Sequence, residues 1–138
     1  MQSRSWEIQE RAARFGKNVA RLCEQVTVTP SSQRIVRNLT TASAAMQTGY
    51  RDTCASSSPE RFILRISAAA RHAKRATACL VLLLELNHVS IEEAREVILE
   101  ARGLQAIFTA SRNTAKRRAQ KRMVSRRTPS ERADRASE

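Results

Sequence analysis

Residues 58–87 read SPERFILRISAAARHAKRATACLVLLLELN, and their apolar side chains recur in alternating steps of four and three. That spacing places one apolar stripe along an α-helix. The stripe consists of Phe62, Ile66, Ala69, Ala73, Ala76, Leu80, Leu83 and, at its end, Asn87. Ser58 followed by Pro59, or Ser57 paired with Glu60, supplies a signal for the helix start. We predict one long amphipathic helix over this stretch.

Three other segments repeat this period, and each has a recognisable boundary. The first covers residues 6–26, the second begins at Thr29 and ends near Cys54, and the last begins with a capping box of Ser90 and Glu93. Their stripes are Ile8, Ala12, Phe15, Val19, Leu22 and Val26; Ile35, Leu39, Ala42, Met46 and Gly49 or Tyr50; and Val97, Ala101, Leu104, Phe108, Ser111 and Ala115. Short connections between such helices favour antiparallel neighbours.

The chain is therefore predicted to be all-α, an up-down-up-down four-helix bundle over residues 1–120. Strong helix formers dominate its composition, which includes only three glycines and three prolines among 138 residues. A chain of this length forms one domain around one core. Residues 121–138 are expected to form a basic, disordered tail.

Apolar residues stand at five consecutive positions and so cover every side of the predicted third helix. They are Leu80, Val81, Leu82, Leu83 and Leu84. One contact within the chain would leave part of that surface exposed, so we expect these residues to form an interface between copies. The alternative is a third helix at the centre of a monomer. The apolar run is far shorter than the roughly 20 residues that span a bilayer, so no membrane segment is predicted.

The charge is strongly positive, with 25 Lys and Arg against 13 Asp and Glu and a net charge of +12. This balance favours a polyanionic partner, RNA or DNA. One cationic set contains no acidic residue and consists of Arg112, Lys116, Arg117, Arg118, Lys121, Arg122, Arg126 and Arg127. A second set, on the predicted third helix, consists of Arg61, Arg65, Arg71, Lys74 and Arg75. We predict that both sets contact phosphates; the alternative is ordinary solvent-facing surface.

Other chemistry finds little support in the sequence. The glycines form no nucleotide-binding fingerprint, and the aromatic residues stand singly. Glu85 and His88 have a spacing found in di-metal bundles, but the required second copy is missing. Cys23, Cys54 and Cys79 fit reduced core thiols, and the N-terminal segment has no apolar leader-like region. We therefore expect a cytoplasmic protein with no enzyme activity, no cofactor and no metal.

Six residues fall at a spacing that resembles a family of four-helix-bundle proteins encoded by intervening sequences in bacterial large-subunit ribosomal RNA. They are Tyr50, Arg51, Cys54, Ser58, Phe62 and Ile63, within a similar region of about residues 42–86. The resemblance implies a non-enzymatic protein that assembles into ring-shaped homopentamers. The same broad fold includes the accessory variability determinants of diversity-generating retroelements, which bind a reverse transcriptase and nucleic acid.

One departure from the family pattern concerns the predicted third helix. Similar proteins carry an acidic run where this chain reads RHAKR at residues 71–75. Any role that rests on those carboxylates is therefore not implied for this chain. The reversal from acidic to basic residues adds to the positive surface and favours a polyanionic partner.

The leading hypothesis is a non-catalytic nucleic-acid-binding protein that serves as an accessory factor of a retroelement reverse transcriptase. Its expected partners are RNA or DNA, that enzyme or another nucleic-acid enzyme, and further copies of itself. The alternative is an oligomeric scaffold that contacts only protein, or an intervening-sequence protein without a nucleic-acid role. The apolar run at residues 80–84 supports the scaffold, whereas the cationic sets support nucleic-acid binding.

Overall fold

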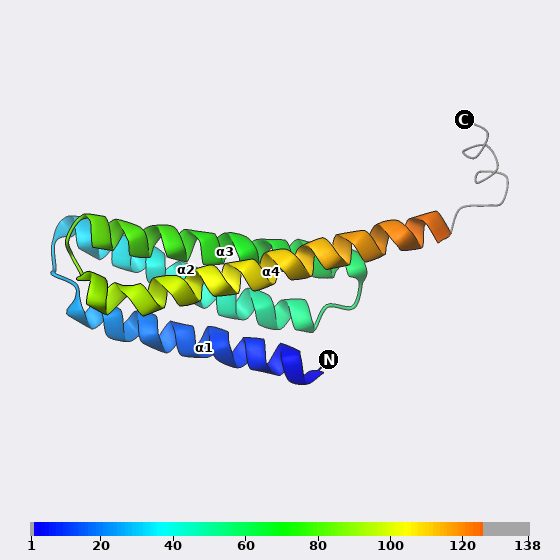
Figure 1. The fold of residues 1–138 in the computed structure, drawn as a ribbon, viewed down its shortest axis with the longest axis horizontal. Helices are drawn as coiled ribbons and strands as arrows, with labels where there is room; N and C mark the ends of the chain where they lie inside the picture. Colours follow the sequence, from blue (N-terminus) through cyan, green and yellow to red (C-terminus); the bar gives the residue numbers. More distant parts are fainter. Residues whose placement is uncertain (1, 126–138) are drawn as a thin grey trace, which may run out of the picture.

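The computed structural model describes residues 2–125, which form four α-helices and no strand (Figure 1). The helices are α1 (Gln2–Gln25), α2 (Pro30–Cys54), α3 (Pro59–Glu85) and α4 (Ile91–Ser125). The predicted all-α class and the four predicted helices are confirmed. None of these four helices combines the length and the apolar character needed to cross a membrane.

Side-chain caps start α2 and α4 where the local sequence predicts them. The Thr29 hydroxyl accepts a hydrogen bond from Ser32 N (3.0 Å), while Thr29 N donates to Ser32 Oγ (2.8 Å). Ser90 and Glu93 form the same reciprocal pair, with distances of 3.2 and 3.0 Å. Each pair satisfies backbone N–H groups that have no acceptor inside the helix.

α3 has a local motif at each end. The Ser58 hydroxyl accepts a hydrogen bond from Arg61 N (3.2 Å), so the start with Ser58 before a proline is the correct one of the two predicted. At the other end, Asn87 has φ 60° and His88 N donates to Leu83 O (2.9 Å). The predicted place of Asn87 on the buried stripe is wrong, because its left-handed backbone ends the helix and leaves it exposed.

The helices form a ring in which consecutive helices run antiparallel (Figure 1). α3 packs along both α2 and α4, whereas α1 packs on α2 and touches α4 less extensively. The α1–α2 and α3–α4 turns meet at one end of the bundle, where Thr27 N donates to His88 O (3.2 Å). The α2–α3 turn lies at the opposite end (Figure 1). This is the up-down-up-down order of the predicted bundle.

The core is built from the predicted stripes, and buried residues occupy the expected positions on all four helices. The rings of Tyr50 and Phe108 stack within it, with centroids 5.1 Å apart. Phe62, Ser111 and Ala115 are half-buried instead of buried. They lie near the end of the bundle where α4 extends beyond its neighbours, so fewer helices surround them (Figure 1).

The leucine-rich turn of α3 lies mostly inside the bundle. Leu80 and Leu83 are fully buried (0% exposed), and Val81 and Leu84 are half-buried against the core. Only Leu82 of the five predicted interface residues is exposed, at 41%. α3 buries more of its circumference than we predicted, because α2 flanks it on one side and α4 on the other. Leu80 and Leu83 thus belong to the core of the bundle, and the interface between copies stays a prediction with Leu82 as its exposed member.

α4 is the longest helix, with 35 residues against 24, 25 and 27 in the others, and its C-terminal part projects beyond the bundle (Figure 1). Phe108 is its last buried residue, and we name residues 109–125 the basic overhang. The helix passes the predicted tail boundary at residue 121 and continues to Ser125. No glycine or proline interrupts residues 104–128, and alanine, arginine and lysine favour helix there. The rest of the predicted tail, residues 126–138, lies outside the described residues.

Candidate nucleic-acid interface

The basic overhang concentrates positive charge on one projecting helix. Its cations are Arg112, Lys116, Arg117, Arg118, Lys121 and Arg122. All are exposed except Arg112, and no acidic residue lies between Ala101 and Ser125. The two ion pairs in the described part of the chain, Arg11–Glu100 and Arg14–Glu10, lie outside the overhang. Arg126 and Arg127, the other predicted members of this set, lie outside the described residues.

Arg112 differs from the other cations of the overhang. Its side chain is half-buried, and its Nε atom is shielded from solvent without a hydrogen-bond partner among residues 2–125. A shielded donor without an acceptor is unfavourable, and this atom is not presented to a partner outside the molecule. Arg112 is therefore the weakest of the six candidates for contact with a phosphate.

The second predicted set, on α3, divides into two roles. The exposed members are Arg61, Arg71, Lys74 and Arg75. Arg65 is half-buried, and its Nη1 atom donates to Asp52 O and to Ser56 Oγ, both at 3.1 Å. Arg65 therefore ties α3 to the end of α2. Burial, together with the charges of Arg71 and Arg75, lowers the pKa of His72, so this histidine adds no cation near neutral pH.

Two exposed cations that the sequence prediction omitted extend this surface onto α4. Arg95 and Arg102 are seven residues apart and so lie on one flank of the helix. At about 100° per residue, this flank is roughly opposite the one that carries Glu96 and Glu100 toward α1. Since α4 lies between α1 and α3 in the ring, both arginines lie toward α3. The recurrence of arginine after seven residues was the signal that could have revealed them.

We name the exposed cations in the middle of α3 and on the first part of the adjacent α4 the α3–α4 basic face. Its members are Arg71, Lys74, Arg75, Arg95 and Arg102. None of the four residues that form the two ion pairs among residues 2–125 belongs to this face. The face and the basic overhang together contain most of the exposed uncompensated charge on these two helices.

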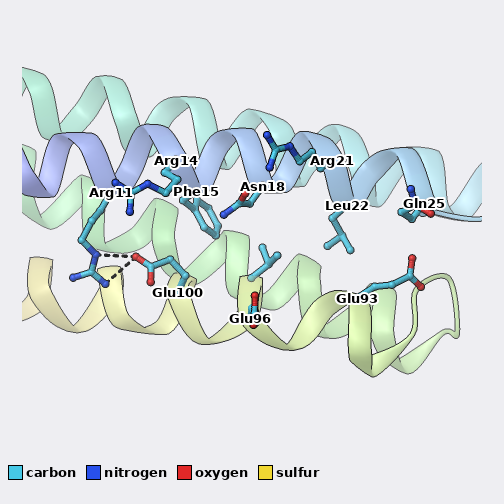
Figure 2. Close-up of a pocket in the computed structure, with 11 residues that line it drawn as sticks. Arg11, Arg14, Phe15, Asn18, Arg21, Leu22, Gln25, Glu93, Glu96 and Glu100 are labelled. Atoms are coloured by element: carbon cyan, nitrogen blue, oxygen red, sulfur yellow. Dashed lines mark hydrogen bonds and ion pairs between the residues drawn. The ribbon is translucent and has the colours of Figure 1, made fainter.

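A groove of about 530 Å³ between α1 and α4 carries both signs of charge (Figure 2). α1 contributes Arg11, Arg14 and Arg21, and α4 contributes Glu93, Glu96 and Glu100. One close pair bridges the groove, since Arg11 Nη2 and Nε lie 2.8 and 2.9 Å from Glu100 Oε1. Because the carboxylates offset the arginines, this groove does not attract a polyanion as the basic overhang does.

No group of three or more His, Cys, Asp or Glu side chains within residues 2–125 is placed to hold a metal ion. Glu85 is the last residue of α3, and the left-handed Asn87 separates it from His88. The spacing of Glu85 and His88 therefore does not place them on one helical face, which the di-metal arrangement requires.

The three cysteines are free thiols in unlike surroundings. Cys23 and Cys79 are half-buried beside the core, and burial raises the pKa of each thiol. Cys54 is exposed, so its predicted place in the core is wrong. It occupies the last position of α2, one helical turn after the buried Tyr50, and its side chain interacts with the Tyr50 hydroxyl.

Comparison with protein-family models, with curated proteins and with solved structures finds no match to this chain. The fold and the charge distribution define its class, a four-helix-bundle protein with a projecting basic helix. The resemblance to intervening-sequence proteins and to accessory variability determinants stays a prediction.

Proposed function

We propose that this protein binds nucleic acid, without catalysing a reaction, through the basic overhang and the α3–α4 basic face. The observation that carries the proposal is the overhang, where exposed Lys and Arg extend along a helix that leaves the bundle and no carboxylate stands among them. Like charges at this density repel one another. A bound polyanion removes that repulsion and releases counterions, which favours the complex.

The proposed binding is electrostatic and only weakly selective for sequence. Lys and Arg that contact phosphates do not read the bases. The described overhang carries no aromatic side chain on which a base can stack, and its exposed large apolar residues are Met123 and Val124. RNA and DNA are therefore both candidate partners.

We further propose that several copies act together as an accessory factor of a retroelement reverse transcriptase. Exposed leucines support contact with protein, since Leu64, Leu82 and Leu99 are 68%, 41% and 56% exposed. In a symmetric assembly each copy repeats the basic face, and linked sites bind one polyanion more tightly than single sites do. The homopentamer and the reverse transcriptase rest on the family resemblance.

The same exposed leucines favour a second candidate, an oligomeric scaffold that contacts only protein or an intervening-sequence protein without a nucleic-acid role. In that case the basic surface serves solubility. The two candidates differ in one measurable property, which is affinity for RNA or DNA at low salt.

Fluorescence anisotropy with a labelled RNA and a labelled DNA duplex, at several salt concentrations, tests the proposal. Wild-type affinity should fall steeply as salt rises. In the triple variant Lys116→Gln, Arg117→Gln and Lys121→Gln, the slope of log affinity against log salt should flatten by up to about 2.7, at about 0.9 for each phosphate that the variant no longer neutralises.

The matched control is the triple variant Lys17→Gln, Arg34→Gln and Arg37→Gln. It removes three exposed cations from α1 and α2, so the net charge changes equally while the overhang is intact. Its slope should change much less. Equal slopes in the two variants would refute the overhang as the contact surface, and undetectable wild-type binding at low salt would favour the scaffold.

A further inference from the structure

At the root of the basic overhang, α4 and the α2–α3 turn enclose a pocket of about 470 Å³. α4 contributes Thr114, Arg118 and Arg122 to its lining. The turn contributes Ser57, and the half-buried Phe62 forms an apolar part of the wall. Arginine, hydroxyl and apolar groups thus meet in a concave site rather than on an open helix surface.

The two arginines of this pocket carry positive charge that nothing in the described chain offsets. Arg118 and Arg122 are one helical turn apart, so both reach the same side of α4. No carboxylate lines the pocket. Neither arginine takes part in an ion pair or a side-chain hydrogen bond within residues 2–125. A pocket with two cations and no anion favours an anionic ligand.

The hydroxyl groups add hydrogen-bond donors to this positive site. Thr114 Oγ1 accepts a hydrogen bond from Arg117 Nη2 (3.3 Å), which leaves its own O–H able to donate. The Ser58 hydroxyl is engaged as the cap of α3, so it is not counted here. Arg65 holds the turn in place by its hydrogen bond to Ser56 Oγ (3.1 Å). The pocket therefore offers donors from α4 and from a turn that is held in place, and a phosphate supplies acceptors for them.

We infer that this pocket holds one backbone phosphate of the bound nucleic acid. The inference rests on the proposed function and identifies where the strand is fixed relative to the bundle. The other overhang cations lie on a single exposed helix, whereas Arg118 and Arg122 face a second element across a pocket. The wall at Pro59 and Phe62 offers an apolar surface to the sugar next to that phosphate.

Two double variants that remove equal charge test the inference. Arg118→Gln with Arg122→Gln changes the pocket, while Lys116→Gln with Lys121→Gln removes two exposed cations from the same helix outside the pocket. The pocket variant should bind the labelled RNA or DNA on the order of tenfold more weakly than the control, because charge-assisted bonds to a held phosphate exceed diffuse attraction. Equal affinities of the two variants would overturn the pocket and leave nucleic-acid binding intact, whereas absent wild-type binding would overturn the proposed function.

A charge-preserving variant separates geometry from charge. Arg118→Lys with Arg122→Lys keeps the net charge but removes the planar fork that binds two phosphate oxygens at once. Its affinity should fall below wild type at equal salt, and unchanged affinity would overturn the bidentate site. All replaced side chains are exposed, so circular dichroism should show wild-type helicity in every variant.

Titration with inorganic phosphate tests whether the pocket binds a phosphate of the nucleic-acid backbone or free phosphate. The amide and guanidinium NMR signals of Ser57, Thr114 and Arg118 should shift with phosphate in the wild type and not in the Gln pocket variant. Shifts spread evenly over all exposed arginines would overturn a defined site. Localised shifts combined with equal nucleic-acid affinities of the two double variants would assign the pocket to free phosphate and overturn the backbone assignment.

Discussion

Asn87 is the one non-glycine residue among residues 2–125 with a positive φ, 60°. A left-handed backbone costs an ordinary residue about 1–2 kcal/mol and costs glycine almost nothing. Asn87→Gly should therefore raise the free energy of unfolding by up to about 1 kcal/mol, and Asn87→Ala should lower it by about 1 kcal/mol. Urea unfolding followed by circular dichroism measures both. Equal stability of the three proteins would contradict this account of the turn.

Glu93 makes the start of α4 sensitive to pH. Hydrogen bonds from the backbone and side chain of Ser90 hold the pKa of this carboxyl below its usual range. Because the folded pKa is lowered, the cap contributes stability above the unfolded pKa and loses it as pH falls through the folded pKa. Glu93→Ala should thus destabilise the protein near neutral pH, with a difference from wild type that shrinks in acid. Urea unfolding of both proteins near neutral pH and in acid tests this. A difference in stability that does not change with pH would refute it.

α4 combines a core helix and a solvated helix in one element. Its acidic residues Glu92, Glu93, Glu96 and Glu100 all lie in the first part, and its cations dominate the rest. This order suits the helix dipole, which favours negative charge at the start and positive charge at the end. Because an isolated helix is marginally stable in water, the overhang depends on its continuity with the buried part of α4.

Removal of residues 112–138 tests the division of α4. It deletes ten cations and three anions, seven units of the net charge of +12, but no buried residue of α4. The shortened chain should unfold cooperatively, with a much flatter dependence of nucleic-acid affinity on salt. Thermal unfolding by circular dichroism and anisotropy measure the two effects. Loss of cooperative unfolding would show that the overhang supports the core.

The whole molecule has two unlike ends. The end formed by the α1–α2 and α3–α4 turns exposes Val28, Leu86 and Ile91, which are 73%, 46% and 49% exposed. The basic overhang projects from the opposite end (Figure 1). A nucleic acid on the overhang therefore leaves these apolar side chains available to another protein or another copy.

Substitutions at two neighbouring leucines of α3 distinguish a role in folding from a role in assembly. Leu83→Asp places a charge in the core and should unfold the chain, because no partner stabilises a buried carboxylate there. Leu82→Asp should keep wild-type helicity and, if copies meet through the outer face of α3, lower the mass seen by light scattering. A wild-type mass of 15.5 kDa at micromolar concentration would contradict self-association.

Helix positions, their caps and their buried stripes could be predicted from the sequence. The helical period and the capping bonds join residues three or four positions apart, as Ser90 and Glu93 do, so they are visible in short stretches. The main set of exposed cations could be predicted for the same reason, since it is contiguous in the chain. The end of α4 was harder to predict, because helix propensity extends it after its apolar stripe has stopped at Phe108.

Packing between helices determines which of these side chains are available. Arg65 is engaged by Asp52 and Ser56 on the preceding helix and turn, and Leu83 is buried because helices flank α3 on both sides. Arg118 lines a pocket only because the α2–α3 turn lies against α4. These contacts join residues that are far apart in the chain, and the period of a single helix carries no information about which neighbour lies on each of its flanks.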